Sequence, residues 1–235
     1  MLNSVPSLIT IEDIHRLKDN LVQESKILEY KRTFGDFSED NKREFLADVS
    51  SFANTAGGHL IYGIIEKDGV PVDISGMEVP GGIDAFTRRI NSIIEDGLEP
   101  KVQADIVNFF LGGDRYIVIV CVKNSWIKPH RISYRNNGKF YARNSAGKYI
   151  MDIYELRRAF LMGADIEERI ERYRNKRLDL IKAGKGFMSV PQSAQIVVHL
   201  LPFSSFSGNL QYDVVNFDVS DFCLLKNGGY SSIIN

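Results

Sequence analysis

Three glutamates stand at positions from which their carboxylates could hold a hard metal cation. Glu24 comes just before a predicted strand over 26–32, Glu29 projects from that strand, and Glu66 follows directly on an apolar run over 59–65. Strand ends and the loops that follow them are frequent positions for chemistry in open sheets. Carboxylate oxygens are the ligands that Mg²⁺ and Mn²⁺ prefer, and such a cation can polarise a phosphodiester and lower the pKa of a bound water.

The same acids also suit plainer interpretations. The chain holds 30 acidic residues, so chance alone produces many such triples, and each acid could be a solvated surface group. Glu29 could also pair with Lys31 on the same strand instead of binding a metal. Spacing alone leaves these alternatives open.

Positive charge is concentrated in one window, although the net charge of the chain is −1. Residues 123–148 contain no acid, and His130 adds a conditional charge to the cationic side chains Lys123, Lys128, Arg131, Arg135, Lys139, Arg143 and Lys148. A near-neutral protein with one basic face commonly meets a polyanion there. The alternative is a solvated strand edge that charge protects from pairing with another chain.

Hydrophobic periodicity predicts an α+β protein in which helices flank one mixed sheet. We expect helices over 10–22, 38–53, 83–97, 152–161 and 165–183, and strands over 26–32, 59–65, 101–110, 115–122, 129–134 and 139–143. Residues 1–160 form the expected main domain. Residues 161–235 form a helix and a C-terminal extension, strand-like near 196–201 and 223–225, which could belong to a longer protein.

Composition argues against several classes of protein. Hydrophobic residues make up 44% and charged residues 25% of the 235, values typical of a globular chain and not of a disordered one. Cys121 and Cys223 lie far apart without a CxxC partner, which argues against a zinc site of paired cysteines and against a disulfide-rich secreted scaffold. Neither a signal peptide nor an apolar stretch of transmembrane length is present, so we expect a cytoplasmic protein without membrane contact.

An ordered set of motifs resembles the Schlafen AlbA-type domain, which in bacteria is also labelled putative DNA-binding or divergent AAA. The resemblance covers roughly residues 20–160. It rests on these fragments, in chain order: Glu24-Ser25 with Glu29-Tyr30-Lys31, Ser51-Phe52-Ala53-Asn54-Thr55-Ala56-Gly57-Gly58, Leu60-Ile61-Tyr62-Gly63-Ile64, Leu98-Glu99-Pro100, Tyr116–Val122, Ser125, Lys128-Pro129-His130, and Phe140-Tyr141-x-Arg143.

The resemblance implies a divalent-metal-dependent endoribonuclease that acts on structured RNA such as tRNA. It implies that Glu24, Glu29 and Glu66 are the catalytic acids that hold Mg²⁺ or Mn²⁺. It also places Lys31 beside them, where it could contact the scissile phosphate. In the animal proteins the third acid is usually Asp, so Glu66 is a conservative departure, and Ile65 stands where an acid is also common.

The basic window would then hold the nucleic-acid backbone. The candidate contacts are Lys128, His130, Arg131, Arg135, Lys139 and Arg143. Two of them have alternatives: His130 could be a packing residue, and Arg143 could form a salt bridge to one of the many acids. The animal proteins pair two such lobes in one chain and carry a zinc knuckle, which this sequence lacks, so we expect a homodimer to rebuild the two-lobed cradle.

Two other functions fit the same resemblance. The domain could be a non-catalytic DNA- or RNA-binding module of a bacterial regulator or defence protein, with residual acids. It could also bind a nucleotide such as ATP, as the older family label suggests. Against that reading, Gly57 and Gly58 follow the C-terminus of a helix, whereas phosphates prefer a helix N-terminus, so we interpret Asn54 and both glycines as structural.

Overall fold

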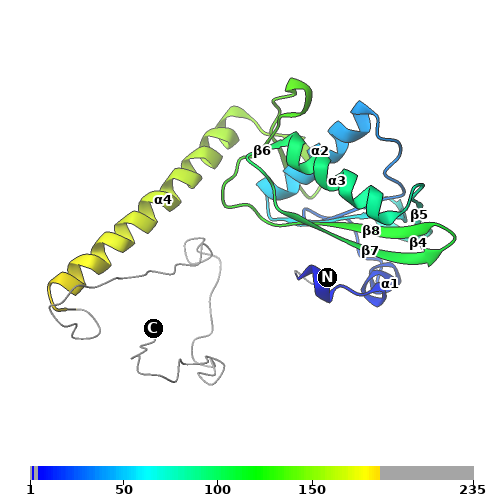
Figure 1. The fold of residues 1–235 in the computed structure, drawn as a ribbon, viewed down its shortest axis with the longest axis horizontal. Helices are drawn as coiled ribbons and strands as arrows, with labels where there is room; N and C mark the ends of the chain where they lie inside the picture. Colours follow the sequence, from blue (N-terminus) through cyan, green and yellow to red (C-terminus); the bar gives the residue numbers. More distant parts are fainter. Residues whose placement is uncertain (1, 3–4, 186–235) are drawn as a thin grey trace, which may run out of the picture. The chain divides into compact units, whose positions relative to one another are not determined.

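The computed structural model describes residue 2 and residues 5–185 (Figure 1). The predicted strands near 196–201 and 223–225 lie outside these residues. The elements, in order, are η1 (Pro6–Leu8), α1 (Ile11–Asp19), β1 (Leu28–Lys31), α2 (Glu39–Asn54), β2 (Gly58–Tyr62), β3 (Ile64–Lys67), β4 (Val70–Ile74), β5 (Met77–Glu78), α3 (Ile83–Gly97), β6 (Leu98–Glu99), β7 (Ala104–Gly112), β8 (Arg115–Val122), β9 (Arg131–Ile132), η2 (Tyr134–Asn136), β10 (Tyr141–Asn144), β11 (Gly147–Ile150) and α4 (Ile153–Lys182).

A mixed five-stranded sheet organises these elements and confirms the predicted α+β class. Strand β8 pairs antiparallel with β7 along one edge and with β2 and β5 along the other, and β1 pairs parallel with β2. Strand β8 is central because it is paired along both edges, and its residues from Ile117 to Val122 are all buried. Three short antiparallel pairs lie outside this sheet: β3 with β4, β6 with β9, and β10 with β11.

Helices cover both faces of the sheet, as Figure 1 shows, with α2 and α3 on one side and α1 on the other. The core under α2 and α3 includes Phe45, Phe52 and Ile94, and the core under α1 includes Ile14 and Leu17. Alternate residues of the sheet strands contribute to the two cores because successive side chains of a strand point to opposite faces.

Local signals in the sequence set the helix starts. Thr10 and Asp13 form a reciprocal capping box at the start of α1, and the Ser38 side chain accepts a hydrogen bond from the Asn41 backbone at the start of α2. Helix α3 runs over the predicted residues and ends at Gly97. A Cβ atom on Gly97 would lie 2.5 Å from the side chain of Leu46, so a glycine there lets α3 approach α2 closely.

The structure adds β4, β5, β6 and β11 to the expected strands and differs from the expected elements at three further places. The run 59–65 is two strands, because Gly63, with φ +96°, separates β2 from β3. A Cβ atom there would also lie 2.9 Å from the Gly76 backbone. The helices expected over 152–161 and 165–183 are one continuous helix, α4. The expected hairpin of 129–134 with 139–143 is reduced to one bridge between Arg131 and Phe140, because β9 pairs with β6 and β10 with β11.

The chain divides into two compact units, Met1–Leu161 and Met162–Asn235. The first unit contains the sheet, both cores and every residue of the candidate site. The described part of the second unit is the continuation of α4 and the residues up to 185. Within the described residues, no helix combines the length and apolar character needed to span a bilayer.

Candidate active site

Strand β1 points two of the predicted catalytic side chains toward α2. Leu28 and Tyr30 are buried in the core on the α1 side, so the alternate residues Glu29 and Lys31 face the opposite side. The Lys31 Nζ atom lies 2.8 Å from Glu29 Oε1 and 4.0 Å from Asp48 Oδ2 of α2. The structure therefore brings Lys31 and Glu29 together as an ion pair and adds a carboxylate that the motifs do not contain.

Arg143 of β10 completes this cluster from inside the protein. Its side chain is only 1% exposed, its Nη2 atom contacts Glu29 Oε2, and its Nη1 atom lies 3.4 Å from Asp48 Oδ1. The guanidinium also lies 4.3 Å above the Phe52 ring, a cation–π contact. Of the two roles considered for Arg143, the structure has the salt bridge, and the predicted contact with a nucleic-acid backbone has no surface on which to occur.

Asp48 is the residue of this cluster that the sequence analysis missed. Its carboxylate is 1% exposed and faces Lys31, Arg143 and Lys148, whose Nζ atom lies 2.8 Å away. A signal was present in the sequence. Asp48 lies on the apolar face of a helix, three residues after Phe45 and four before Phe52, where an acid must find partners inside the fold.

Opposing effects act on the pKa values of this cluster. Burial raises the pKa of Glu29, but the hydrogen bond from Lys31 and the charge of Arg143 outweigh it, so the net shift is downward. Burial lowers the pKa of Lys31, and the Asp48 and Glu29 carboxylates more than reverse this effect. Burial raises the pKa of Asp48 against the opposing charges of Lys148 and Lys31. Glu29 and Lys31 therefore stay charged near neutral pH.

Glu24 and Glu66 lie beside this cluster and are tied to the β3–β4 hairpin. The Glu24 backbone N–H donates to the Gly69 carbonyl at 2.7 Å, and the Gly69 N–H donates to Glu66 Oε2 at 2.7 Å. Glu24 Oε1 accepts a hydrogen bond from the Tyr30 backbone at 2.8 Å. Burial raises the pKa of Glu24, and the charges of Glu29 and Glu66 raise it further. Glu24 is therefore close enough to Glu29 and to Glu66 for both carboxylates to repel it.

Two of the three acids keep one oxygen that a divalent cation could use. Glu24 and Glu66 each give one oxygen to a backbone N–H, and among the described residues their second oxygens, Glu24 Oε2 and Glu66 Oε1, accept no hydrogen bond. Mg²⁺ is commonly held by one or two carboxylates together with waters and substrate phosphates. Both oxygens of Glu29, in contrast, already face cations. In the described part of the chain, no three His, Cys, Asp or Glu side chains are arranged around a common metal position.

The remaining basic candidates divide between surface and interior. Arg131, Arg135 and Lys139 are exposed; Arg131 pairs with Glu99 at 2.7 Å, and Arg135 with Glu39 at 2.8 Å. Lys128 is partly buried, its Nζ atom lies 3.5 Å from the Thr55 carbonyl, and burial lowers its pKa. These four side chains are available to a polyanion at the surface or close to it.

His130, in contrast, is fully buried. Its Nδ1 atom lies 2.6 Å from the Pro100 carbonyl, so Nδ1 carries the proton and donates, while its backbone N–H donates to Asn54 Oδ1 at 2.7 Å. Burial lowers the pKa of His130, the Pro100 carbonyl opposes this, and Lys128 adds to it. The structure therefore places His130 in the packing role considered for it, and not on a nucleic-acid-binding surface.

The Gly57–Gly58 turn holds two segments of backbone close together. A Cβ atom on Gly57 would lie 2.6 Å from the Asn124 backbone nitrogen, and one on Gly58 would lie 2.5 Å from the Ile27 carbonyl. Asn54 fixes the neighbouring strands, since its Nδ2 atom donates to the carbonyls of His130 and Tyr141. These contacts give both glycines and Asn54 a structural role.

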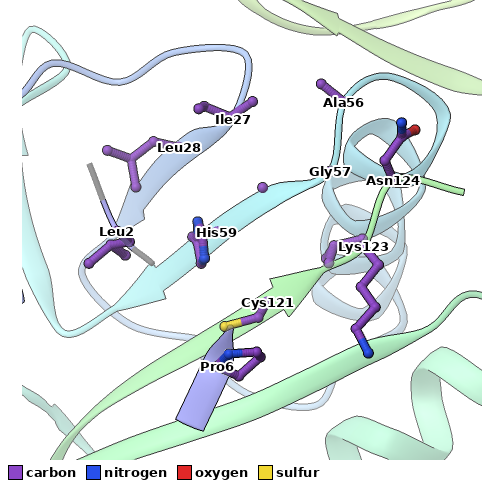
Figure 2. Close-up of a pocket in the computed structure, with 12 residues that line it drawn as sticks. Leu2, Pro6, Ile27, Leu28, Ala56, Gly57, His59, Cys121, Lys123 and Asn124 are labelled. Atoms are coloured by element: carbon purple, nitrogen blue, oxygen red, sulfur yellow. The ribbon is translucent and has the colours of Figure 1, made fainter. Parts of the chain in front are cut away.

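A cavity of about 320 Å³ lies beside this turn (Figure 2). Its walls are mostly apolar and include Leu2, Pro6, Leu28 and Cys121, and Lys123 is the cation among its lining residues. Lys123 is itself paired with Asp105 at 3.2 Å. Glu24, Glu29, Lys31 and Glu66 do not line the cavity, so it is separate from the candidate active site.

The sequence of the candidate domain matches a known protein family. The family model described as "Schlafen, AlbA_2" matches residues 24–152, more than half of the chain. The chain belongs to the Schlafen AlbA_2 family. The matched region of this Schlafen AlbA_2 protein begins at Glu24 and includes Glu29, Lys31, Glu66 and the whole basic window.

Among solved structures, the chain is similar to the DIP2311 protein from Corynebacterium diphtheriae. The identity is 16% and the TM-score 0.42, and the match covers 60% of this Schlafen AlbA_2 chain and 30% of that protein. The chain thus corresponds to less than a third of the length of DIP2311. No curated protein matches the chain.

Proposed function

We propose that this Schlafen AlbA_2 protein binds structured RNA such as tRNA and cleaves it with the help of Mg²⁺ or Mn²⁺. The single observation that carries the proposal is the position of Glu24. Its backbone N–H and Glu66 Oε2 both hydrogen-bond to the Gly69 backbone, and the charges of Glu29 and Glu66 contribute to raising the pKa of Glu24. Family membership supports the nucleic-acid ligand.

Glu24 and Glu66 are the proposed principal metal ligands. A bound cation would favour the charged form of Glu24, whose pKa is raised by burial and further by the charges of Glu29 and Glu66. Glu29 lies next to them but is held by Lys31 and Arg143, so it acts chiefly by fixing Lys31. When bound, a divalent cation would polarise the phosphodiester and lower the pKa of a water molecule. Lys31 would stabilise the negative charge that develops on the phosphate.

The cations at or near the surface of the basic window are the proposed backbone contacts. Lys128, Arg131, Arg135 and Lys139 lie at or near the surface of the window 128–139. Contacts of lysine and arginine with phosphates release counterions, so binding of this kind weakens as salt rises and depends little on sequence.

We also propose that two copies of the chain associate. A folded RNA stem presents phosphates on two strands, and a two-fold axis would supply a second set of the same cations. Residues near the start of α4, among them Ile153, Tyr154, Phe160 and Leu161, expose large apolar side chains that a partner could cover. The sequence pattern favoured two other interface elements: the amphipathic segment 165–183, which is part of α4, and the apolar run near 196–201, which lies outside the described residues. Light scattering tests this: a monomer at micromolar concentration, both free and with RNA, would contradict it.

The test of the proposed function separates binding from cleavage. Labelled tRNA is first titrated with the protein in a metal chelator, and Mn²⁺ is then added to the complex and the RNA is resolved by size. Binding followed by Mn²⁺-dependent fragments is the expected result. Binding without fragments, under Mg²⁺ or Mn²⁺, would favour the non-catalytic module. Absence of binding to RNA would contradict the proposal entirely.

A further inference from the structure

The charged cluster over α2 has a buried layer and a surface layer. Asp48 and Arg143 are each only 1% exposed at the side chain and form the buried layer. Above them, the side chain of Lys31 is 32% exposed and that of Lys148 is 19% exposed. Both lysines are therefore partly open to solvent above the buried pair.

Asp48 holds both lysines at once. The Lys148 Nζ atom lies 2.8 Å from Asp48 Oδ1, and the Lys31 Nζ atom lies 4.0 Å from Asp48 Oδ2. Lys31 comes from β1 and Lys148 from β11, so one carboxylate of α2 fixes two cations from distant parts of the chain. Because Asp48 is buried, it can orient the two lysines without itself meeting a ligand.

Glu44 is the weak member of the cluster. It lies one turn before Asp48 on α2, its side chain is 60% exposed, and it contacts Lys148 Nζ. Ion pairs of exposed carboxylates contribute little to stability because water screens them. The side chain can therefore leave Lys148 at small cost when another anion arrives.

Charge balance identifies the kind of anion. The cluster consists of three cations, Lys31, Arg143 and Lys148, and three carboxylates, Glu29, Asp48 and Glu44. If Glu44 moves away, one positive charge stays uncompensated between the two lysines. A phosphodiester carries one negative charge and several acceptor oxygens, so it replaces Glu44 without leaving a net charge.

We propose that Lys31 and Lys148 form a clamp for one phosphate of the nucleic-acid backbone, with Asp48 as its positioning residue and Glu44 as the group that the phosphate displaces. This inference rests on the proposed function, since it takes a polynucleotide as the ligand. It adds Lys148 to the binding surface and places the bound phosphate next to Glu29.

The test compares two single charge removals on the surface. Fluorescence anisotropy of labelled tRNA, measured in chelator over a series of salt concentrations, gives the affinity and its salt dependence. Glu44→Gln removes the competing anion, and Glu78→Gln is its matched control, since Glu78 is also exposed and pairs with Arg115 at 3.1 Å. We expect Glu44→Gln to tighten binding by about fivefold at low salt, the factor that one charge near contact distance supplies in water, and Glu78→Gln to change it much less.

Lys148→Gln supplies the second measurement. We expect it to weaken binding and to reduce the slope of log affinity against log salt by about one, while Lys148→Arg retains both. Glu44→Gln keeps the test decisive if Lys148→Gln folds poorly. Equal effects of Glu44→Gln and Glu78→Gln, or an unchanged slope in folded Lys148→Gln, would overturn the clamp while tRNA binding by the wild type upholds the proposed function. Failure of the wild type to bind tRNA would overturn both.

Discussion

Replacement of Arg143 tests whether this residue belongs to a buried charge network or to an ordinary surface ion pair. Arg143→Gln removes a guanidinium that is 1% exposed and leaves Glu29 and Asp48 without their interior partner. Removing one member of a buried pair costs roughly 3–5 kcal/mol, because the remaining charge stays desolvated. The matched control is Arg131→Gln, which removes an arginine bound to Glu99 through two of its nitrogens but 49% exposed. Exposed pairs contribute about 0–1 kcal/mol.

Urea unfolding followed by circular dichroism measures both changes. We expect the midpoint for Arg143→Gln to fall far below that of the wild type, with an unchanged slope, and the midpoint for Arg131→Gln to stay close to it. Comparable losses in the two variants, each below about 1 kcal/mol, would refute the description of Arg143 as an essential buried partner. A large loss in Arg131→Gln alone would refute it as well.

Three further predictions follow from individual residues. Glu24→Gln should raise the free energy of unfolding at neutral pH without metal. Burial and acidic neighbours raise the pKa of Glu24, so this residue contributes stability only below its ordinary pKa, and that stability is lost as pH rises through the folded pKa. Glu29→Gln should lower the free energy of unfolding, because the lowered pKa of Glu29 gives stability that is present above its ordinary pKa and is lost as pH falls through the folded pKa. Thermal melts of both variants between about pH 3 and pH 7 check the opposite signs, and shifts of the same sign at neutral pH would contradict them. Gly57→Ala should lower the stability of the protein by more than about 1 kcal/mol, since the φ of Gly57 is +72° and a Cβ there would meet backbone atoms of Asn124 and Val122 at 2.6 and 2.7 Å. Gly138→Ala is the control, because Gly138 also has a positive φ but no atom lies near the position of its Cβ. Chemical unfolding of the two variants gives the difference in stability. An Arg131→Glu/Lys139→Glu double variant should lose most tRNA affinity at low salt, whereas equal binding by variant and wild type in filter retention would exclude these exposed cations from the interface.

The helices and the longer strands of the main sheet were predictable from the sequence because they depend on local signals, whereas the short strands β4, β5, β6 and β11 were not expected. The caps at Thr10 and Ser38 and the β-branched run of β8 each act within a few residues. The break at Gly63 was less visible, since a glycine within an apolar run is compatible with a continuous strand. The need for it comes from the close backbone of Gly76, which only the tertiary fold brings there.

The sequence predicted which residues form the candidate site better than it predicted the ion pairs that these residues make. The motif pattern named Glu24, Glu29, Lys31 and Glu66, and the fold brings Glu24 within reach of the other three. The pairing of Arg143 with Asp48 joins residues far apart in the sequence. The charge of Arg143 alone could not show whether its side chain is buried in an ion pair or exposed at the surface. The apolar face of α2 carried the missing signal, because an acid placed there requires a buried cation.

Single-turnover cleavage of tRNA by Glu24→Gln tests the central claim most directly. Gln keeps the size of the side chain and an oxygen for the Tyr30 N–H, but it removes the proposed metal-binding charge. With Mn²⁺ present, we expect the wild type and the control Glu78→Gln to cleave at similar rates and Glu24→Gln to be at least about a hundredfold slower, since metal stabilisation of the reacting phosphate is worth several kcal/mol. Glu24→Gln cleaving as fast as the control, while still dependent on Mn²⁺, would contradict the assignment of the metal site to these carboxylates.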